Sequence, residues 1–120
     1  MKKKPRIYLS RDSVCLGDDF SAPHEKEWIQ KSDNDLLLVM NRCKANYLPS
    51  NIQGNNPGWV AKNGANIIAV IAQHWDESKL IPPYTTTEYL KDKDGNIYIH
   101  FEYLQNENPN VIYANLVANA

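Results

Sequence analysis

The sequence predicts an α+β fold in which one principal helix packs on a mainly antiparallel sheet. Three observations support this class. Only one segment, near residues 33–47, repeats its apolar residues at helical spacing, whereas several others are short and rich in β-branched or alternating apolar residues. An Asn-Gly pair between two of these segments favours a tight hairpin turn. The length of 120 residues suits a single globular domain, 1–120, with one core.

The most apolar stretch runs from residue 58 to residue 75. Asn63-Gly64 tolerates the positive φ angles of a hairpin turn and separates a short strand at 59–61 from a longer one at 66–75. Both alternation classes of the longer strand are apolar: Ile67, Ala69 and Ile71 on one side, Ile68, Val70 and Ala72 on the other. A buried helix is the competing interpretation, but β-branched residues favour a strand covered on both faces and central in the sheet.

The helix near 33–47 has a polar start and an apolar face. Ser32 or Asp33 can cap it, and Asp35 places negative charge in its first turn. Pro49 marks its end. The residues that recur at steps of three and four, and that should lie on the sheet, are Leu36, Val39, Met40, Cys43 and Tyr47.

The remaining segments predict further strands. Short strands are expected at 7–9 and at 25–30. Segment 13–16 can continue the first of these strands after a polar break, and Trp28 should point inward from the second. Segments 84–91 and 97–104 should pair as a second hairpin around the turn at 92–96, and a final strand is expected at 111–117. In segment 97–104 the inward residues are Ile97, Ile99, Phe101 and Tyr103, so His100 should lie on the outer face. Residues 49–58 and 76–83 are expected to be connecting loops.

Charge and composition exclude several classes of protein. No apolar run approaches the ~18 residues that a membrane span needs, so no membrane partner is expected. Residues 1–11 carry five bases, but no nucleic-acid motif follows them, so they are expected to form a solvated tail without a nucleic-acid partner.

No apolar signal core follows Lys2, Lys3 and Lys4, so the expected location is cytoplasmic. There, Cys15 and Cys43 are expected as thiols in preference to a disulfide.

Residues able to support catalysis are scattered. Asp18, Asp19, His24 and Glu25 occur in and beside the first loop, and His74, Asp76 and Glu77 occur at the end of the long strand. Two carboxylates and two histidines could hold a divalent metal if the fold joined them. No motif of metal-ligand spacing is present, and Ser10, Ser13 and Ser21 have no base partner that the sequence identifies. We therefore expect no catalysis, no cofactor and no bound metal.

Three segments, IYLSRDSVCLGDDFSAPHE, NYLPSNIQG and AVIAQHWDESKL, together resemble a family of small bacterial α+β proteins. Some of these proteins serve as immunity proteins against polymorphic or contact-dependent growth-inhibition toxins. The resemblance implies a cytoplasmic protein that binds and neutralises a cognate toxin domain. It covers about a third of the chain and transfers no functional residue.

A binding surface for a basic toxin domain needs acidic groups that steer the encounter and aromatic anchors. The candidate residues are Asp18, Asp19, Glu25, Trp75, Asp76, Glu77 and Tyr84. An equally common explanation is that each acid is simply a solvated surface residue and that each aromatic ring is part of the core. The alternative function is a metal-dependent hydrolase or nuclease that uses Asp18, Asp19, His24 and His74.

Overall fold

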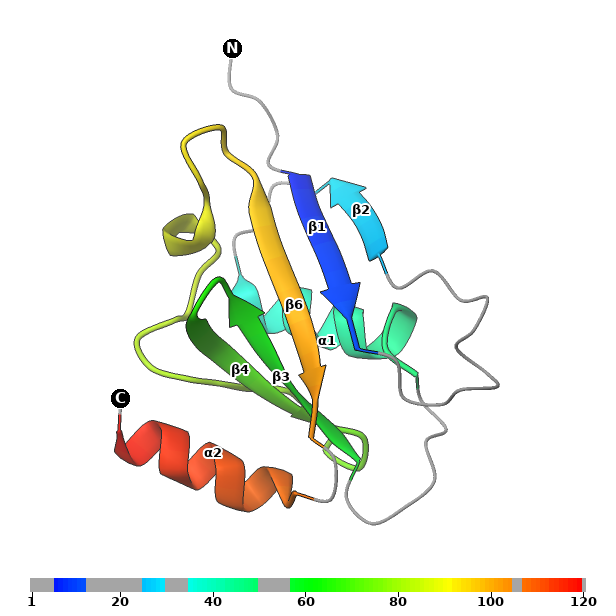
Figure 1. The fold of residues 1–120 in the computed structure, drawn as a ribbon, viewed down its shortest axis with the longest axis vertical. Helices are drawn as coiled ribbons and strands as arrows, with labels where there is room; N and C mark the ends of the chain where they lie inside the picture. Colours follow the sequence, from blue (N-terminus) through cyan, green and yellow to red (C-terminus); the bar gives the residue numbers. More distant parts are fainter. Residues whose placement is uncertain (1–5, 13–24, 30–34, 50–56, 105–106, 120) are drawn as a thin grey trace.

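A computed structural model describes residues 6–12, 25–29, 35–49, 57–104 and 107–119 (Figure 1). Within these ranges, five strands of five to seven residues and one two-residue strand form a single sheet, accompanied by two α-helices. The predicted α+β class is therefore confirmed. The elements are β1 (Arg6–Arg11), β2 (Glu25–Ile29), α1 (Leu36–Asn46), β3 (Gly58–Asn63), β4 (Asn66–Ala72), β5 (Lys79–Leu80), the 3-10 helix η1 (Glu88–Leu90), β6 (Ile97–Tyr103) and α2 (Pro109–Ala118).

The strand order is β2-β1-β6-β3-β4-β5. All neighbouring strands are antiparallel except β1 and β6, which are parallel. Because only the short β5 lies beyond β4, the prediction that 66–75 is central was wrong; β6 and β3 are the central strands. The strand also ends at Ala72 and not at Trp75. Its apolar residues are buried on both faces, as predicted, but the predicted alternation was wrong at its start. Ile68 packs in the same cluster as Ala69 and Ile71, and Ile67 packs with Val70, because the register shift opposite Ala61 and Lys62 interrupts the alternation.

The hairpin formed by β3 and β4 confirms the turn prediction. Gly64 has a φ of 63°, a conformation that glycine adopts without the steric cost a β-carbon brings. Val60 pairs with Val70, and the register shifts between Ala61 and Lys62. Local turn chemistry alone was therefore sufficient to place this hairpin.

The predicted pairing of 84–91 with 97–104 was wrong. Residues 88–90 form η1, and the described part of 84–91 contains only an isolated bridge between Thr86 and Asp35. The turn at 92–96 does form, since Asp92 Oδ1 accepts from the backbone N–H groups of Asp94 and Asn96, each at 2.9 Å. It leads into β6, whose two edges are already occupied by β1 and β3. A third strand has no free backbone edge of β6 to pair with.

The predicted strand at 111–117 was also wrong, because this segment lies within α2. Asn108 caps the helix by accepting from the Asn110 N–H at 2.9 Å, and Pro109 occupies its first turn. The β-branched residues favoured a strand, but packing of one helix side against the sheet prevails over that propensity. The residues on that side are Ile112, Tyr113 and Leu116.

Helix α1 forms where its apolar spacing predicted. Asp35 is the N-cap and accepts from the Leu37 N–H at 3.0 Å, whereas the expected caps Ser32 and Asp33 lie outside the described residues. Leu36, Val39, Met40 and Cys43 are fully buried, and Tyr47 packs at the border of the core. They meet the inward side chains of the sheet on what we term the α1 face: Ile7, Leu9, Trp59, Ala61, Ile68, Ala69, Ile71, Ile97, Ile99 and Phe101.

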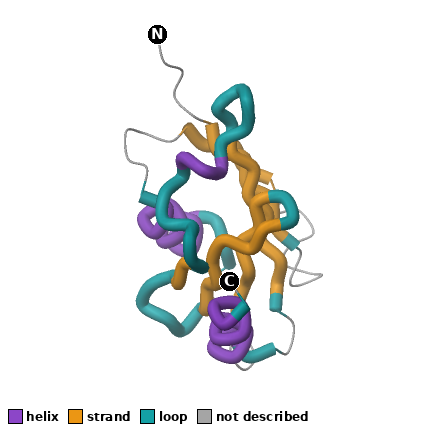
Figure 2. Tube along the Cα trace, turned by 90° about the vertical axis from the view of Figure 1, so that its left-hand side faces the viewer, coloured by secondary structure: helices purple, strands orange, loops and turns teal. Residues whose placement is uncertain are grey.

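The opposite face of the sheet carries a smaller apolar cluster. Val60, Val70, Ile81 and Leu104 are buried beneath α2. At Gly58 a β-carbon would lie 2.7 Å from Pro109 Cγ, so glycine permits the close approach of the α2 N-terminus. Figure 1 shows α1 behind the sheet and α2 beside β4, and Figure 2, turned by 90°, shows α1 to the left of the strands. No helix in the described part of the chain is long and apolar enough to cross a bilayer.

Candidate functional site

Beyond α2, the second face of the sheet is polar, and none of the described elements covers it. No described helix lies in front of β1 and β6 in Figure 1. Because successive side chains of a strand alternate between faces, the residues between the buried ones of β1, β3 and β6 point outward here. We term this surface the open face; its residues are Tyr8, Ser10, Asp12, Lys62, Tyr98, His100 and Glu102.

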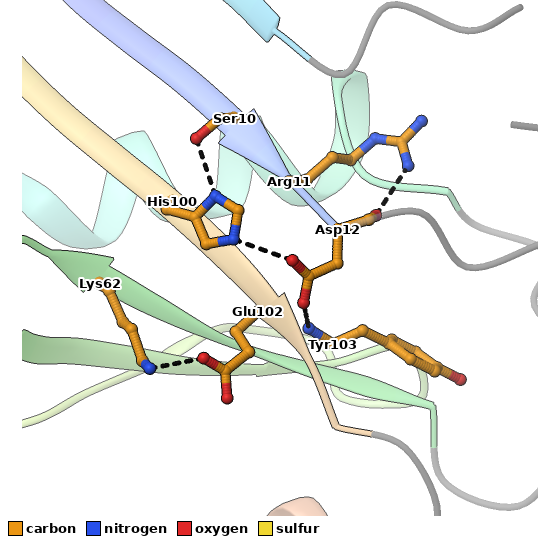
Figure 3. Close-up of polar contacts among 7 residues, drawn as sticks. All are labelled: Ser10, Arg11, Asp12, Lys62, His100, Glu102 and Tyr103. Atoms are coloured by element: carbon orange, nitrogen blue, oxygen red, sulfur yellow. Dashed lines mark hydrogen bonds and ion pairs between the residues drawn. The ribbon is translucent and has the colours of Figure 1, made fainter. Parts of the chain in front are cut away.

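Three of these side chains form a continuous hydrogen-bonded chain (Figure 3). The Ser10 Oγ atom lies 2.8 Å from His100 Nδ1. The other ring nitrogen, Nε2, lies 3.0 Å from Asp12 Oδ1. The second carboxylate oxygen of Asp12 accepts from the backbone N–H of Tyr103 at 3.0 Å. Each member of the chain is thus held by at least one directional contact.

The backbone of β1 and β6 positions the chain. Ser10 lies opposite His100 in the parallel register. At the end of β1, the Asp12 N–H donates to the Phe101 carbonyl at 3.0 Å, and Arg11 Nη1 donates to the Asp12 carbonyl at 3.3 Å. The Arg11 side chain is buried on the α1 face, which anchors the strand end from below.

The hydrogen-bond pattern determines the roles of the two ring nitrogens in the neutral imidazole. An ionised carboxylate only accepts, so Nε2 carries the hydrogen that faces Asp12. Nδ1 then presents its lone pair to the Ser10 hydroxyl, which donates. Hydroxyl, imidazole and carboxylate have the same order as in a serine hydrolase, with the ring nitrogens exchanged. Sequence reasoning identified no base for Ser10, because no local signal links it to a histidine 90 positions away.

Aromatic and charged groups flank this chain on the open face. The rings of Tyr8 and Tyr98 stack with centroids 4.9 Å apart and planes inclined by 13°. Tyr98 is 53% exposed, so the stack presents apolar area to solvent. Lys62 pairs with Glu102 on the side of β6 away from β1.

Tyr103 connects the open face to the core. Its N–H binds Asp12, but its ring lies on the α1 face and meets the Trp59 ring edge-on at 5.0 Å. Burial raises the pKa of the Tyr103 phenol, so this group remains a neutral hydroxyl near neutral pH.

The structure describes only part of the surface predicted to bind a partner. Asp18 and Asp19 lie outside the described residues, as do His24, Cys15 and the possible strand at 13–16. Glu25 begins β2, with its backbone opposite Ser10. These positions leave Trp75, Asp76, Glu77 and Tyr84 as the predicted residues whose side chains are described.

Those four residues do not form one surface. Trp75 is half-buried on the α2 side, where its ring meets the Tyr113 ring at 6.4 Å and lies 4.4 Å from Lys79 Nζ. Asp76 and Glu77 follow it in an exposed turn. Tyr84 instead packs against the core of the α1 face. The two predicted aromatic anchors therefore lie on opposite sides of the sheet.

The described ranges contain no group of three or more His, Cys, Asp and Glu side chains placed to hold a metal ion. His74 is exposed in the turn after β4, and the other proposed ligands of the alternative hydrolase are outside these ranges. A cavity of about 60 Å³ is lined by Lys44, Leu48, Pro49, Trp59, Ile71 and Gln73. This volume is well below the ~300 Å³ of small-molecule pockets, so the open face is the stronger candidate site.

Comparison with known proteins adds no functional assignment. No family model, curated protein or solved structure matches the chain.

Proposed function

We propose that this chain is a cytoplasmic binding protein of the immunity type, which covers a basic toxin domain with its open face. The observation that carries the proposal is the outward-facing stack of Tyr8 on Tyr98. Large exposed rings on a rigid strand pair are what a protein interface uses as anchors, because they bury much apolar area at little cost in side-chain entropy.

The surroundings of the stack support an interface. Ser10, His100, Lys62 and Glu102 surround it with polar groups that can pair at the rim of a contact. The sheet beneath is held by the α1 core, so the face is preorganised and a partner need not order it.

The charges of the chain favour a basic partner. Asp76 and Glu77 are exposed in the turn beside Trp75, which belongs to the same side of the sheet as the open face. Asp18 and Asp19 follow Asp12 by six and seven positions in the sequence. Exposed carboxylates steer a cationic partner over about a Debye length, roughly 8 Å at physiological salt.

The experiment is to produce this protein with the product of its neighbouring gene, then to measure complex formation and the survival of producing cells. Tyr98→Ala should speed dissociation about 10-fold or more, because anchor rings act mainly on the dissociation rate. Tyr89→Ala is the matched control, since Tyr89 is 78% exposed on η1, away from the sheet. Absence of binding and of protection would reject the function; equal effects of the two variants would reject the surface.

The electrostatic contribution has a separate test. Asp76→Lys combined with Glu77→Lys should slow association and reduce its dependence on salt, and so should Asp18→Lys combined with Asp19→Lys. Unchanged association rates in both double variants would show that the carboxylates do not steer the partner.

A further inference from the structure

We infer that Ser10, His100 and Asp12 form a nucleophile, a base and a positioning carboxylate that hydrolyse aryl esters of small carboxylic acids. This inference is independent of the proposed binding function. It depends on the hydrogen-bonded chain from Ser10 Oγ through both His100 nitrogens to Asp12, and on the aromatic stack beside it.

The geometry meets two requirements of an activated serine. The base must lie within about 2.6–3.2 Å of the nucleophile and be oriented by a third group. Here the base is 2.8 Å from the hydroxyl and the orienting carboxylate 3.0 Å from the far nitrogen. Asp12 is itself fixed by the Tyr103 N–H, so its hydrogen bond holds the imidazole with Nδ1 free to accept the serine proton.

Exposure makes the hydroxyl reachable. The side chains of His100 and Asp12 are 43% and 41% exposed, and no described element covers them. A substrate can therefore approach Ser10 from the solvent side of the sheet without any movement of the described elements.

The neighbouring tyrosines define the substrate class. Tyr8 and Tyr98 lie two positions before Ser10 and His100 on their strands, so they are the next side chains along the same face. Aromatic rings prefer offset-stacked or edge-to-face contacts at centroid separations of about 4.5–7 Å. An aryl leaving group resting on this stack places the ester carbonyl next to Ser10.

The reaction has two balanced steps. Ser10 Oγ attacks the carbonyl carbon as its proton moves to His100 Nδ1; the bond to the aryloxide then breaks, and the proton leaves with the phenol. A water molecule attacks the resulting acyl-serine, passes a proton to Nδ1 and releases the carboxylic acid. Ester and water thus become acid and phenol, and Ser10 is regenerated with its proton.

A sulfonylating reagent and an acyl donor test the nucleophile in the intact protein. Phenylmethylsulfonyl fluoride should add one sulfonyl group at Ser10, located by peptide mapping, and 4-nitrophenyl acetate should give steady release of 4-nitrophenol. General-base assistance contributes about 10²–10⁴-fold, so His100→Gln should slow both reactions at least about 100-fold. Ser10→Ala should abolish the mapped adduct. His74→Gln, at an exposed histidine in the turn after β4, should leave both rates unchanged.

Asp12 requires a test that distinguishes positioning from structural support. Asp12→Asn offers an amide that can donate to Nε2, which shifts the ring hydrogen to Nδ1 and removes the acceptor for Ser10. The expected result is a kcat lowered about 10-fold or more with KM unchanged, and exchanged ¹⁵N signals of the two His100 ring nitrogens. Asp94→Asn, in the exposed turn before β6, is the matched control.

Labelling that is absent from Ser10, or equally fast in His100→Gln protein that unfolds cooperatively, would overturn the inference. If His100→Gln fails to fold, the wild-type protein provides the test. ¹⁵N signals that place the ring hydrogen of His100 on Nε2, together with a sulfonyl adduct at Ser10, support the inference. A ring hydrogen on Nδ1 or an adduct elsewhere overturns it. Ser10→Ala retains both tyrosines, so loss of hydrolysis with retained partner binding would separate this activity from the proposed function.

Discussion

The two faces of the sheet are built from the same strands but are used differently. On β6, Ile99 is 1% exposed beneath α1, while its neighbour Tyr98 is 53% exposed on the open face. The α1 face is a continuous apolar core, whereas the opposite face is covered by α2 at one end and polar at the other. This difference shows that one face can supply most of the buried core, which leaves half of the other face available for the proposed binding and catalysis.

The largest difference between the two faces is expected when the same charge is placed on each face of β6 in turn. Ile99→Asp should prevent folding, because it buries an unpaired carboxylate in the core at a cost of several kcal/mol. Tyr98→Asp should lower the free energy of unfolding by about 1 kcal/mol or less, since the site faces solvent. Far-UV circular dichroism and urea denaturation measure both. Cooperative unfolding of Ile99→Asp near the wild-type midpoint would contradict the assignment of the α1 core.

A second comparison removes one large side chain from each helix. Met40 of α1 is 0% exposed, so Met40→Ala should cost about 2–5 kcal/mol. Leu116 of α2 is only half-buried against the smaller cluster, so Leu116→Ala should cost about 1 kcal/mol. Chemical denaturation of both variants at one temperature gives the difference. A larger loss for Leu116→Ala would make α2 the main support of the sheet.

The helix caps extend this comparison to the backbone. Asp35→Ala removes the acceptor for the Leu37 N–H and should destabilise the whole protein by about 1 kcal/mol, because α1 covers the main core. Asn108→Ala removes the equivalent bond in α2 and should chiefly fray that helix. Amide hydrogen exchange separates the two outcomes: protection falls throughout the sheet in the first variant and within α2 in the second. If both variants lose amide protection equally throughout the sheet, the two helices do not differ in their importance for the core.

The smallest effect expected is a pH dependence at Tyr103, whose ring lies on the α1 face. Burial raises the pKa of its phenol above about 10, so the folded protein retains a proton that the unfolded chain releases. The contribution of Tyr103 to the free energy of unfolding is therefore constant below about pH 10 and falls as pH rises through the raised pKa. Tyr103→Phe should reduce this alkaline loss, measured as the difference between its unfolding midpoints and those of wild type from pH 9 to 11. If the unfolding midpoints of the two proteins change in parallel over this pH range, the Tyr103 phenol does not contribute to the alkaline loss of stability.

Elements with a strong local signal were predictable. The β3-β4 hairpin follows from Asn63-Gly64, and α1 from apolar residues repeated every three or four positions. Segments 84–91 and 111–117 were predicted wrongly because their β-branched and aromatic residues suit a strand whenever an edge is available. In the first case β1 and β3 occupy both edges of β6; in the second the Asn108 cap, Pro109 and packing on β4 favour a helix.

The fold class, the helix that covers the core and the outward position of His100 follow from local sequence patterns, because they depend on periodicities of 3.6 and 2 that operate over a few residues. The order of neighbouring strands, in contrast, becomes visible in the folded sheet alone. The parallel register of β1 and β6 places His100 beside Ser10 and returns Asp12 to the same ring. Such a pairing joins segments 90 positions apart and depends on which backbone edges remain free once the whole sheet has formed, a property that no local pattern encodes.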